Sequence, residues 1–163
     1  MRPSKDAYYL KVASVVSERS TCLRANCGAV LVKNDTIIST GFNGNPGGVE
    51  NCCDSIIGCK RKTSSPNTDR HLCFAVHGEM NCIVNLARSG GTSSVGSTLY
   101  VWFKRLDNSR NSNDKPCSEC MRLIINAGIK RIVNYTEDNY HTTLHETTIQ
   151  KGILTTTAIK EDL

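Results

Sequence analysis

The sequence lacks any long run of apolar residues. Its apolar runs, such as residues 28–32 and 123–125, are far too short to cross the hydrocarbon core of a bilayer. The first six residues also lack the apolar stretch that a secretory signal needs. These absences argue against a membrane protein and against export, so we expect a soluble, cytoplasmic protein with no membrane partner.

Dense basic clusters are missing as well, although the formal net charge is +5. The only tight cluster is Lys-Arg-Lys at 60–62. A protein that binds polynucleotides usually combines basic residues with aromatic ones, and only residues 102–105 hint at this. We therefore do not expect a nucleic-acid partner. The positive charge indicates either an ordinary mixed-charge surface or attraction of a small anionic substrate such as a nucleotide.

The 163 residues contain neither an internal repeat nor a boundary that would separate a second domain. With 39% hydrophobic and 21% charged residues, the composition is that of an ordinary globular protein, long enough to bury a core. We therefore expect one domain over residues 1–163.

Cysteine, by contrast, is abundant, with nine residues. The odd number argues against complete pairing in intramolecular disulfides. Without an export signal, reduced thiols that bind metal or take part in catalysis are the better interpretation.

Hydrophobic spacing and turn residues predict helices and strands that alternate through the second half of the chain. Helices are expected at about 4–20, 77–90 and 116–128, with a weaker one at 144–150. Strands are expected at 28–32, 36–39, 98–103, 131–135 and 153–158, the first two as a hairpin. This order predicts a mixed, partly parallel sheet covered by helices.

Two segments show no regular period. Residues 41–73 are rich in Gly, Asn, Ser, Pro and Cys. An irregular segment of this length in a compact domain is usually functional or held by something other than a core, and here we expect metal to hold it. Residues 104–115 are polar, with three asparagines, and are expected to form a loop.

Two short motifs carry the most specific signal, His-Gly-Glu at 77–79 and Pro-Cys-Ser-Glu-Cys at 116–120. Cys117 and Cys120 are three residues apart at the start of a predicted helix, so both sulfurs can face one ion. The helix N-terminus also favours thiolate over thiol. With His77 as third ligand, a tetrahedral Zn²⁺ keeps one position open for water, which is the arrangement of a catalytic site.

Glu79 follows His77 by two residues and is better placed to carry protons than to bind the metal. Zinc lowers the pKa of bound water towards neutrality, and a carboxylate can pass a proton from that water to leaving ammonia. A lone Cys-x-x-Cys is often a structural zinc or redox site, and a non-catalytic zinc module would need no such carboxylate. The two motifs in this order are typical of zinc-dependent hydrolytic deamination of a nucleobase.

The chain resembles the deoxycytidylate (dCMP) deaminase family over residues 8–135. Beyond the two motifs, the resemblance depends on Ser-Thr-Cys at 20–22, Gly-Ala-Val at 28–30, Thr-Gly-Phe-Asn-Gly-Asn-Pro at 40–46 and Ile-Ile-Asn-Ala-Gly-Ile-Lys at 124–130. It implies an α/β fold, a three-layer α/β/α sandwich around a five-stranded mixed sheet. It also implies deamination of dCMP to dUMP and ammonia, supplying dUMP for thymidylate synthesis. The same chemistry on dCTP, a modified deoxycytidine nucleotide or a polynucleotide cytosine stays open.

Three residues are candidate substrate contacts. By resemblance Asn43 would hydrogen-bond the deoxyribose, and the backbone N–H of Gly78 can bind the pyrimidine carbonyl. Arg24 could pair with the 5′-phosphate, although an ordinary surface cation would look the same in the sequence.

Some related enzymes carry a second, structural zinc. This chain offers six candidates for four ligand positions, namely Cys22, Cys52, Cys53, Cys59, His71 and Cys73. We expect Cys22, Cys52, Cys59 and Cys73, with His71 in reserve, because a closed tetrahedral site would hold the 41–73 segment in place. The alternative is that several are merely small buried residues. Cys27 and Cys82 are expected in the core.

Regulation is also implied by the resemblance. Related enzymes are commonly homo-oligomers, often hexamers, that dCTP activates and dTTP inhibits, and Mg²⁺ would accompany the nucleotide effector. The resemblance implies these properties for this chain as well.

Three positions depart from the family pattern. Gly78 stands where the family usually has alanine, which makes the segment less rigid, and Phe42 replaces a common tyrosine and so removes a hydroxyl. The 104–115 segment is longer than the usual link. It could form a lid, alter substrate choice or be a tolerated surface loop.

Overall fold

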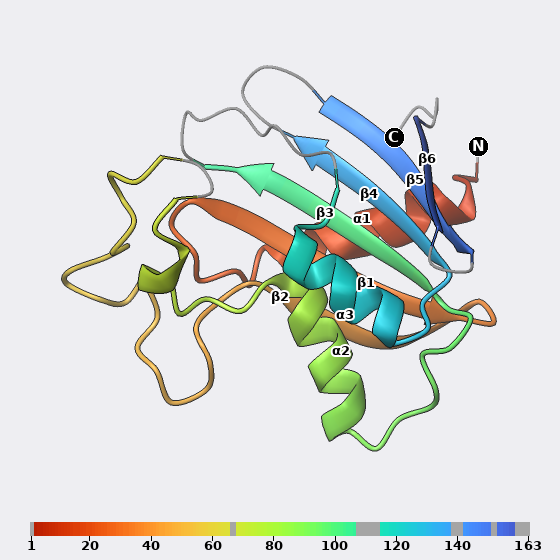
Figure 1. The fold of residues 1–163 in the computed structure, drawn as a ribbon, viewed down its shortest axis with the longest axis horizontal. Coiled ribbons are helices and arrows are strands. Elements are labelled where there is room, and N and C mark those ends of the chain that lie inside the picture. The colour runs from red at the N-terminus through yellow and green to blue at the C-terminus, as the bar shows by residue number, and fades with distance from the viewer. Residues whose placement is uncertain (1, 66–67, 107–114, 138–141, 151–152, 159–163) are drawn as a thin grey trace.

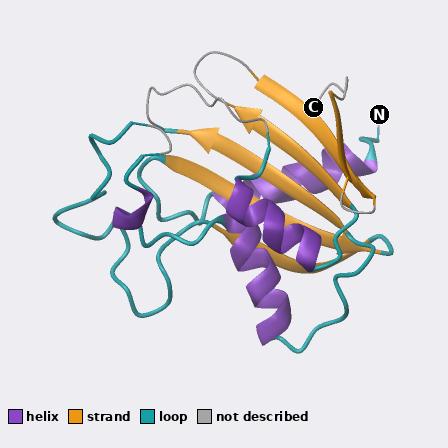
Figure 2. Ribbon diagram, in the orientation of Figure 1, coloured by secondary structure: helices purple, strands orange, loops and turns teal. Residues whose placement is uncertain are grey.

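The computed structural model describes residues 2–65, 68–106, 115–137, 142–150 and 153–158. A six-stranded mixed sheet forms the middle layer, in the order β2-β1-β3-β4-β5-β6. Helix α1 (Lys5–Ser17) covers one face, and α2 (Gly78–Arg88) and α3 (Ser118–Asn126) cover the other (Figure 1). The colouring by secondary structure in Figure 2 shows the same three layers. This is the α/β/α sandwich that the sequence predicts, with one strand more than the five expected.

The first helix and hairpin follow local sequence signals. The Ser4 side chain caps α1, because its Oγ accepts a hydrogen bond from the Ala7 backbone N–H at 3.1 Å. Strands β1 (Ala25–Lys33) and β2 (Thr36–Phe42) form the predicted hairpin. Asn34 and Asp35 between them have φ values of 50° and 61°, the left-handed conformation that two-residue hairpin turns require.

A parallel strand pair positions α3. Strand β3 (Thr98–Arg105) runs antiparallel to β1 and parallel to β4 (Arg131–Glu137). Because α3 connects two parallel strands, its N-terminus lies beyond the carboxyl end of β3, the edge where open α/β sheets usually bind ligands. The helix is followed by Gly128 with a φ of 74°, a left-handed residue typical of helix ends.

The prediction of a helix over 144–150 is wrong. These residues belong to β5 (Thr142–Gln150), which pairs antiparallel with β4 and with β6 (Ile153–Ala158). Thr147 and Ile149 are buried whereas Gln150 is exposed, so burial alternates with the two-residue period of a strand. Threonine and isoleucine are β-branched and favour this conformation. The resulting hairpin accounts for the additional strand.

A hydrophobic core lies on each face of the sheet. The larger one, under α2 and α3, includes Leu31, Leu99, Ile124 and Ile132. The smaller one, under α1, includes Tyr9, Leu10, Val30 and Val133.

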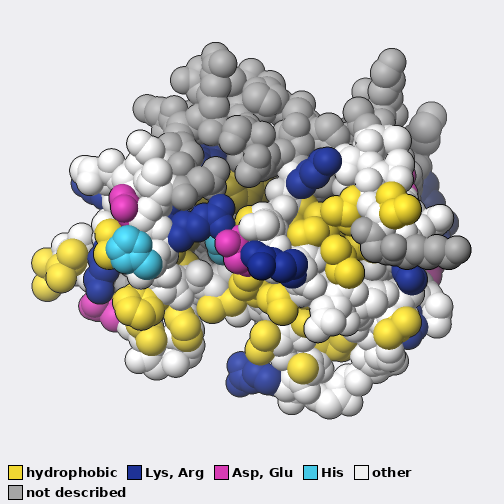
Figure 3. All heavy atoms as spheres, in the orientation of Figure 1, with side chains coloured by type: hydrophobic (Ala, Val, Ile, Leu, Met, Phe, Trp, Pro, Cys, Tyr) yellow, Lys and Arg dark blue, Asp and Glu magenta, His cyan; other side chains and the backbone are white. Residues whose placement is uncertain are grey.

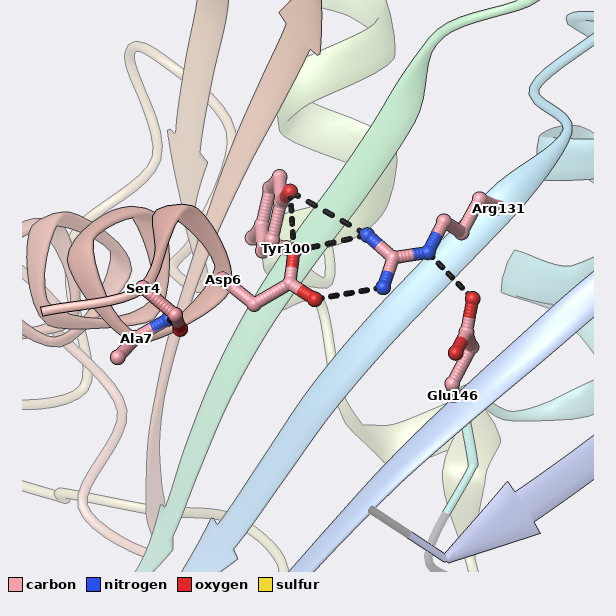
Figure 4. Close-up of polar contacts among 6 residues, drawn as sticks. All are labelled: Ser4, Asp6, Ala7, Tyr100, Arg131 and Glu146. Carbon is pink, nitrogen blue, oxygen red and sulfur yellow. Dashed lines mark hydrogen bonds and ion pairs between the residues drawn. The ribbon is translucent and has the colours of Figure 1, made fainter. Parts of the chain in front are cut away.

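A polar network beside the smaller core ties α1 to the sheet (Figure 4). Arg131 on β4 donates to both carboxylate oxygens of Asp6, at 2.8 Å from Nη1 and 2.6 Å from Nη2. Its Nε donates to Glu146 on β5, and the Tyr100 hydroxyl donates to Asp6 at 2.7 Å. The Arg131 guanidinium is the main reason why the pKa of Asp6 lies below its usual value.

The described part of the chain between β2 and α2 is irregular, as predicted, apart from the 3-10 turn η1 (Arg70–Leu72). Its two ends are joined by backbone hydrogen bonds between Gly44 and Val76, at 3.1 and 2.8 Å. The loops between these ends extend past the carboxyl end of β3, at the left of Figure 1. They therefore lie on the same side as the start of α3.

Lys104 and Arg105 continue β3 beyond its predicted end. Most of the predicted 104–115 loop, residues 107–114, lies outside the described residues. Within the described chain, none of the helices has the length and apolar character that crossing a bilayer requires.

Candidate active site

Two helix N-termini bring His77, Cys117 and Cys120 together. His77 directly precedes α2 and Cys117 directly precedes α3, so both residues stand where helical N–H groups are not yet paired within the helix. His77 Nδ1 lies 3.3 Å from the sulfur of Cys117 and 3.3 Å from that of Cys120. Among the described residues, this is the one group of three or more potential ligands whose atoms lie within 4.8 Å of one another.

These separations fit zinc. A tetrahedral Zn²⁺ at about 2.0–2.1 Å from a histidine nitrogen and about 2.3 Å from a thiolate needs nitrogen–sulfur separations of about 3.5 Å. The observed distances of 3.3 Å differ from this by a few tenths of an ångström at most. The three side chains can therefore bind one zinc ion without movement of the two helices.

The pKa values of the Cys117 and Cys120 thiols also bear on cation binding. Hydrogen bonds from Cys120 and His77 lower the pKa of the Cys117 thiol to about 4. The pKa of Cys120 is raised, first by its hydrogen bond to Cys117 and then by burial. One thiolate is thus already stable at neutral pH, and a bound cation would stabilise the second, since metal ligation requires the deprotonated form.

Glu79 is a buried carboxylate close to this group of three residues. It lies in the first turn of α2 and is 6% exposed, an unusual degree of burial for a carboxylate. Its Oε2 lies 3.6 Å from the Cys27 sulfur. Its ligand atoms are not part of the compact group formed by His77, Cys117 and Cys120. A buried carboxylate beside the ligands, but not among them, can move protons at the site.

A cavity of about 380 Å³ opens beside these residues, within the range of small-molecule sites. His77, Glu79, Cys117, Val101 and Phe103 line one part of it. Its wall also includes the basic residues Arg24, Arg61, Arg70, Arg105 and Lys115. Lys and Arg side chains gather near the middle of the face shown in Figure 3. The excess of basic over acidic side chains in the wall favours an anionic ligand.

The three predicted substrate contacts all have protein partners. The Asn43 side chain accepts from the Cys27 backbone N–H and donates to the Ala25 carbonyl, both at 2.8 Å. The Gly78 backbone N–H is hydrogen-bonded to the Cys27 sulfur. Arg24 lines the cavity, but its Nη1 and Nη2 donate at 3.1 Å to the carbonyls of Arg61 and Ser64. The main observed role of Asn43 and Arg24 is therefore to fasten the irregular segment to the start of β1.

The four cysteines expected at a second metal site line the same cavity. They are Cys22, Cys52, Cys59 and Cys73, all half-buried. The pKa of Cys52 is raised by burial and then by the nearby thiols of Cys59, Cys22 and Cys73. Their sulfurs are not as close together as the ligand atoms of the first group.

The other candidates for the second site, His71 and Cys53, are exposed. Of the two cysteines predicted for the core, Cys82 is fully buried and Cys27 is 4% exposed. The contact between Cys27 and Glu79 has no signal in the sequence, because 52 residues separate them. Arg105 and Arg70 were also not predicted to line the cavity, since neither belongs to a recognisable motif.

Residues 3–136 match the family model "Cytidine and deoxycytidylate deaminase zinc-binding region". The chain belongs to this family. The model's zinc-binding region, together with the group of His77, Cys117 and Cys120, identifies zinc as the metal that this centre fits.

Individual family members are similar over most of the chain. The deoxycytidylate deaminases of Schizosaccharomyces pombe and Saccharomyces cerevisiae are each 32% identical to it, over 140 and 135 residues. These alignments cover 85% and 82% of this chain but 39% and 38% of the yeast proteins, so the chain spans about two fifths of their length.

A solved structure of a family member is also similar. The dCMP deaminase from the cyanophage S-TIM5, in complex with dCMP and dUMP, superposes with a TM-score of 0.61 at 32% identity. The match covers 84% of this chain and 85% of the phage chain. The fold and most of the length are therefore shared with a member of the family that is similar in size.

Proposed function

We propose that this protein catalyses the zinc-dependent hydrolytic deamination of dCMP to dUMP and ammonia. The observation that carries the proposal is the buried Glu79 beside the compact group of His77, Cys117 and Cys120, at the wall of a cavity with basic lining. The cyanophage enzyme bound to dCMP and dUMP supports this choice of substrate.

Zinc binding, proton transfer and substrate contact are assigned to different residues. His77, Cys117 and Cys120 would hold zinc, which when bound makes a water molecule nucleophilic at neutral pH. Glu79 would accept a proton and deliver it to the leaving amino group, a role for which its burial excludes competing bulk water. By the family resemblance, the backbone N–H of Gly78, the amide of Asn43 and the guanidinium of Arg24 would contact the base, sugar and phosphate in addition to the protein groups that they bind in this structure.

Ammonia release tests the proposal directly. We expect the zinc-loaded protein to release ammonia from dCMP much faster than from dCTP or deoxycytidine. Glu79→Gln keeps the shape of the side chain and should lower kcat by at least about a hundredfold, because general acid–base catalysis contributes this much. Glu18→Gln, an exposed residue at the end of α1, is the matched control and should leave kcat unchanged. Faster ammonia release from dCTP or deoxycytidine would contradict dCMP as the substrate. If none of the three compounds released ammonia, the proposed deaminase activity would be contradicted.

We further propose that Cys22, Cys52, Cys59 and Cys73 hold a second, structural zinc, with His71 as the reserve ligand. The mutual effect of these thiols on the pKa of Cys52 supports their proximity. Elemental analysis should then give about two zinc ions per chain, and Cys59→Ser should lower this number to about one without loss of the first site. A ratio of one in the unaltered protein would contradict the second site.

Assembly and regulation form the last part of the proposal. Homo-oligomers, activation by dCTP with Mg²⁺ and inhibition by dTTP are proposed from the family resemblance. Fully exposed Ile56 and the largely exposed Ile57 in the irregular segment are consistent with burial against another copy. Light scattering and titration of activity with each nucleotide would test these properties. One domain over 1–163 and a cytoplasmic location stay predictions.

A further inference from the structure

Cys27 is a buried thiol that the proposed chemistry does not use, yet it contacts the residue on which that chemistry depends. It lies in β1, is 4% exposed, and its sulfur is 3.6 Å from Glu79 Oε2. This is a suitable distance for a hydrogen bond from a thiol, which is longer than one from nitrogen or oxygen. Among the described residues, no other hydrogen-bond partner of the Glu79 carboxylate is present.

The backbone around Cys27 holds the sulfur in a fixed position. The Cys27 N–H donates to the Asn43 side chain at 2.8 Å, and the Cys27 carbonyl accepts from the Asn43 N–H at 3.1 Å. On the other side, Cys27 is paired with Phe103 of β3. A strand residue bound on both sides has little freedom, so its side chain is a rigid support for Glu79.

The same sulfur limits the residue at position 78. A Cβ atom at Gly78 would lie 3.0 Å from the Cys27 sulfur and 3.1 Å from the Cys27 carbonyl oxygen. Both are shorter than ordinary carbon contacts with sulfur or oxygen, so alanine would push the sulfur or the start of α2 aside. The start of α2 carries His77 and Glu79. The family usually has alanine at position 78. Glycine at this position avoids a close contact with the Cys27 sulfur, so the two residues fit together.

We infer that Cys27 is a positioning residue: its thiol donates a hydrogen bond to Oε2 of Glu79, leaving Oε1 for proton transfer, and its size favours glycine over alanine at position 78. The thiol remains a donor because burial and the nearby Glu79 raise its pKa. The positioning role rests on the proposed function of Glu79, whereas the packing against Gly78 does not.

The first experiment measures kcat, KM, zinc content and thermal stability for substitutions of Cys27. Cys27→Ala removes the donor, Cys27→Val fills the space without a donor, and Cys27→Ser keeps a donor. For alanine and valine we expect kcat to fall about tenfold, KM to change less than about twofold and zinc content to stay constant. Serine should keep kcat within about threefold of the unaltered protein.

Cys82→Ala is the matched control. Cys82 is also fully buried in the larger core, but its hydrogen-bond partners are Ser39 and Leu31 rather than Glu79. It should lower the melting temperature about as much as Cys27→Ala and leave kcat unchanged. The inference is overturned if both alanine variants change kcat equally, or if Cys27→Ser is as slow as Cys27→Val. If the unaltered protein does not deaminate dCMP at all, the proposed function fails instead.

The second experiment needs no activity. Gly78→Ala should lower the melting temperature of the unaltered protein, although alanine is normally the better residue in a helix. In the Cys27→Ala background, Gly78→Ala should lower the melting temperature clearly less. Some loss should remain, because the contact of 3.1 Å with the carbonyl oxygen of residue 27 is still present. In the Cys82→Ala background the loss should be undiminished. Equal losses in all three backgrounds would refute the packing between Cys27 and Gly78.

Discussion

Replacing Asp6 by Asn isolates the contribution of the polar network that ties α1 to the sheet. The substitution keeps the size of the side chain but removes the charge that Arg131 contacts with two nitrogens, at 2.6 and 2.8 Å. The two side chains are 19% and 28% exposed, so water screens their attraction only partly. Arg131 keeps its contact with Glu146 and is therefore not left without a counter-ion.

The expected loss of stability follows from this geometry. Removing one partner of a fully buried ion pair costs about 3–5 kcal/mol, whereas an exposed pair contributes about 0–1 kcal/mol. A bidentate pair with partial burial and a second counter-ion should lie between these limits, at about 2 kcal/mol. For a chain of this size, that corresponds to a decrease of about 4–8 °C in melting temperature.

The pH dependence gives a second, independent check. Because the pKa of Asp6 is lowered in the folded protein, its charge stabilises the fold above the unfolded pKa of about 3.9, and this stabilisation is lost as the pH falls through the lower, folded value. Thermal unfolding of both proteins should show a constant difference from pH 7 to about pH 5, then a decreasing one below about pH 4. Equal melting temperatures at pH 7, or a difference that persists in full at pH 2, would refute the reasoning.

Two further substitutions test other contacts. Gly41→Ala would place a Cβ atom 2.2 Å from the Cys82 backbone nitrogen, so we expect a loss of about 3 kcal/mol in urea unfolding, whereas Gly47→Ala, with no atom within 4 Å, should change stability by less than about 0.5 kcal/mol. Arg70→Ala removes the 2.7 Å ion pair with Glu119 at the cavity wall, whose side chains are 41% and 46% exposed. It should therefore alter the melting temperature by less than about 3 °C but raise the KM for dCMP, and an unchanged KM would show that this part of the wall does not face the substrate.

Local signals predict most of the fold and the grouping of the three residues that we propose as zinc ligands. The Ser4 cap, the Asn34–Asp35 turn and the Gly128 helix end all depend on neighbouring residues. His77 and Cys117 could be predicted because each motif stands at a helix N-terminus, and the alternation of helices and strands brings both to one edge of the sheet.

Contacts that depend on the register between distant strands could not be predicted in this way. The 144–150 segment has few apolar residues, so its hydrophobic spacing predicts a helix only weakly, and pairing with β4 decides its conformation. Similarly, the use of Asn43 and Arg24 to hold the loops depends on where the irregular segment returns to β1. The approach of Cys27 to Glu79 depends on the packing of α2 against β1.

The pairing of Gly44 with Val76 makes the intervening chain a separable insert. Both ends of this insert meet at one backbone bridge, so its length can change without moving β2 or α2. The entropy of closing a loop grows slowly with length, and doubling the insert would cost only about 0.6 kcal/mol. One wall of the cavity, including Cys52, Arg61 and Arg70, belongs to this insert. The cavity wall that this insert contributes can therefore change while His77, Cys117 and Cys120, the residues proposed to bind zinc, stay in place. This makes the insert the natural segment to replace when the specificity is to be redesigned.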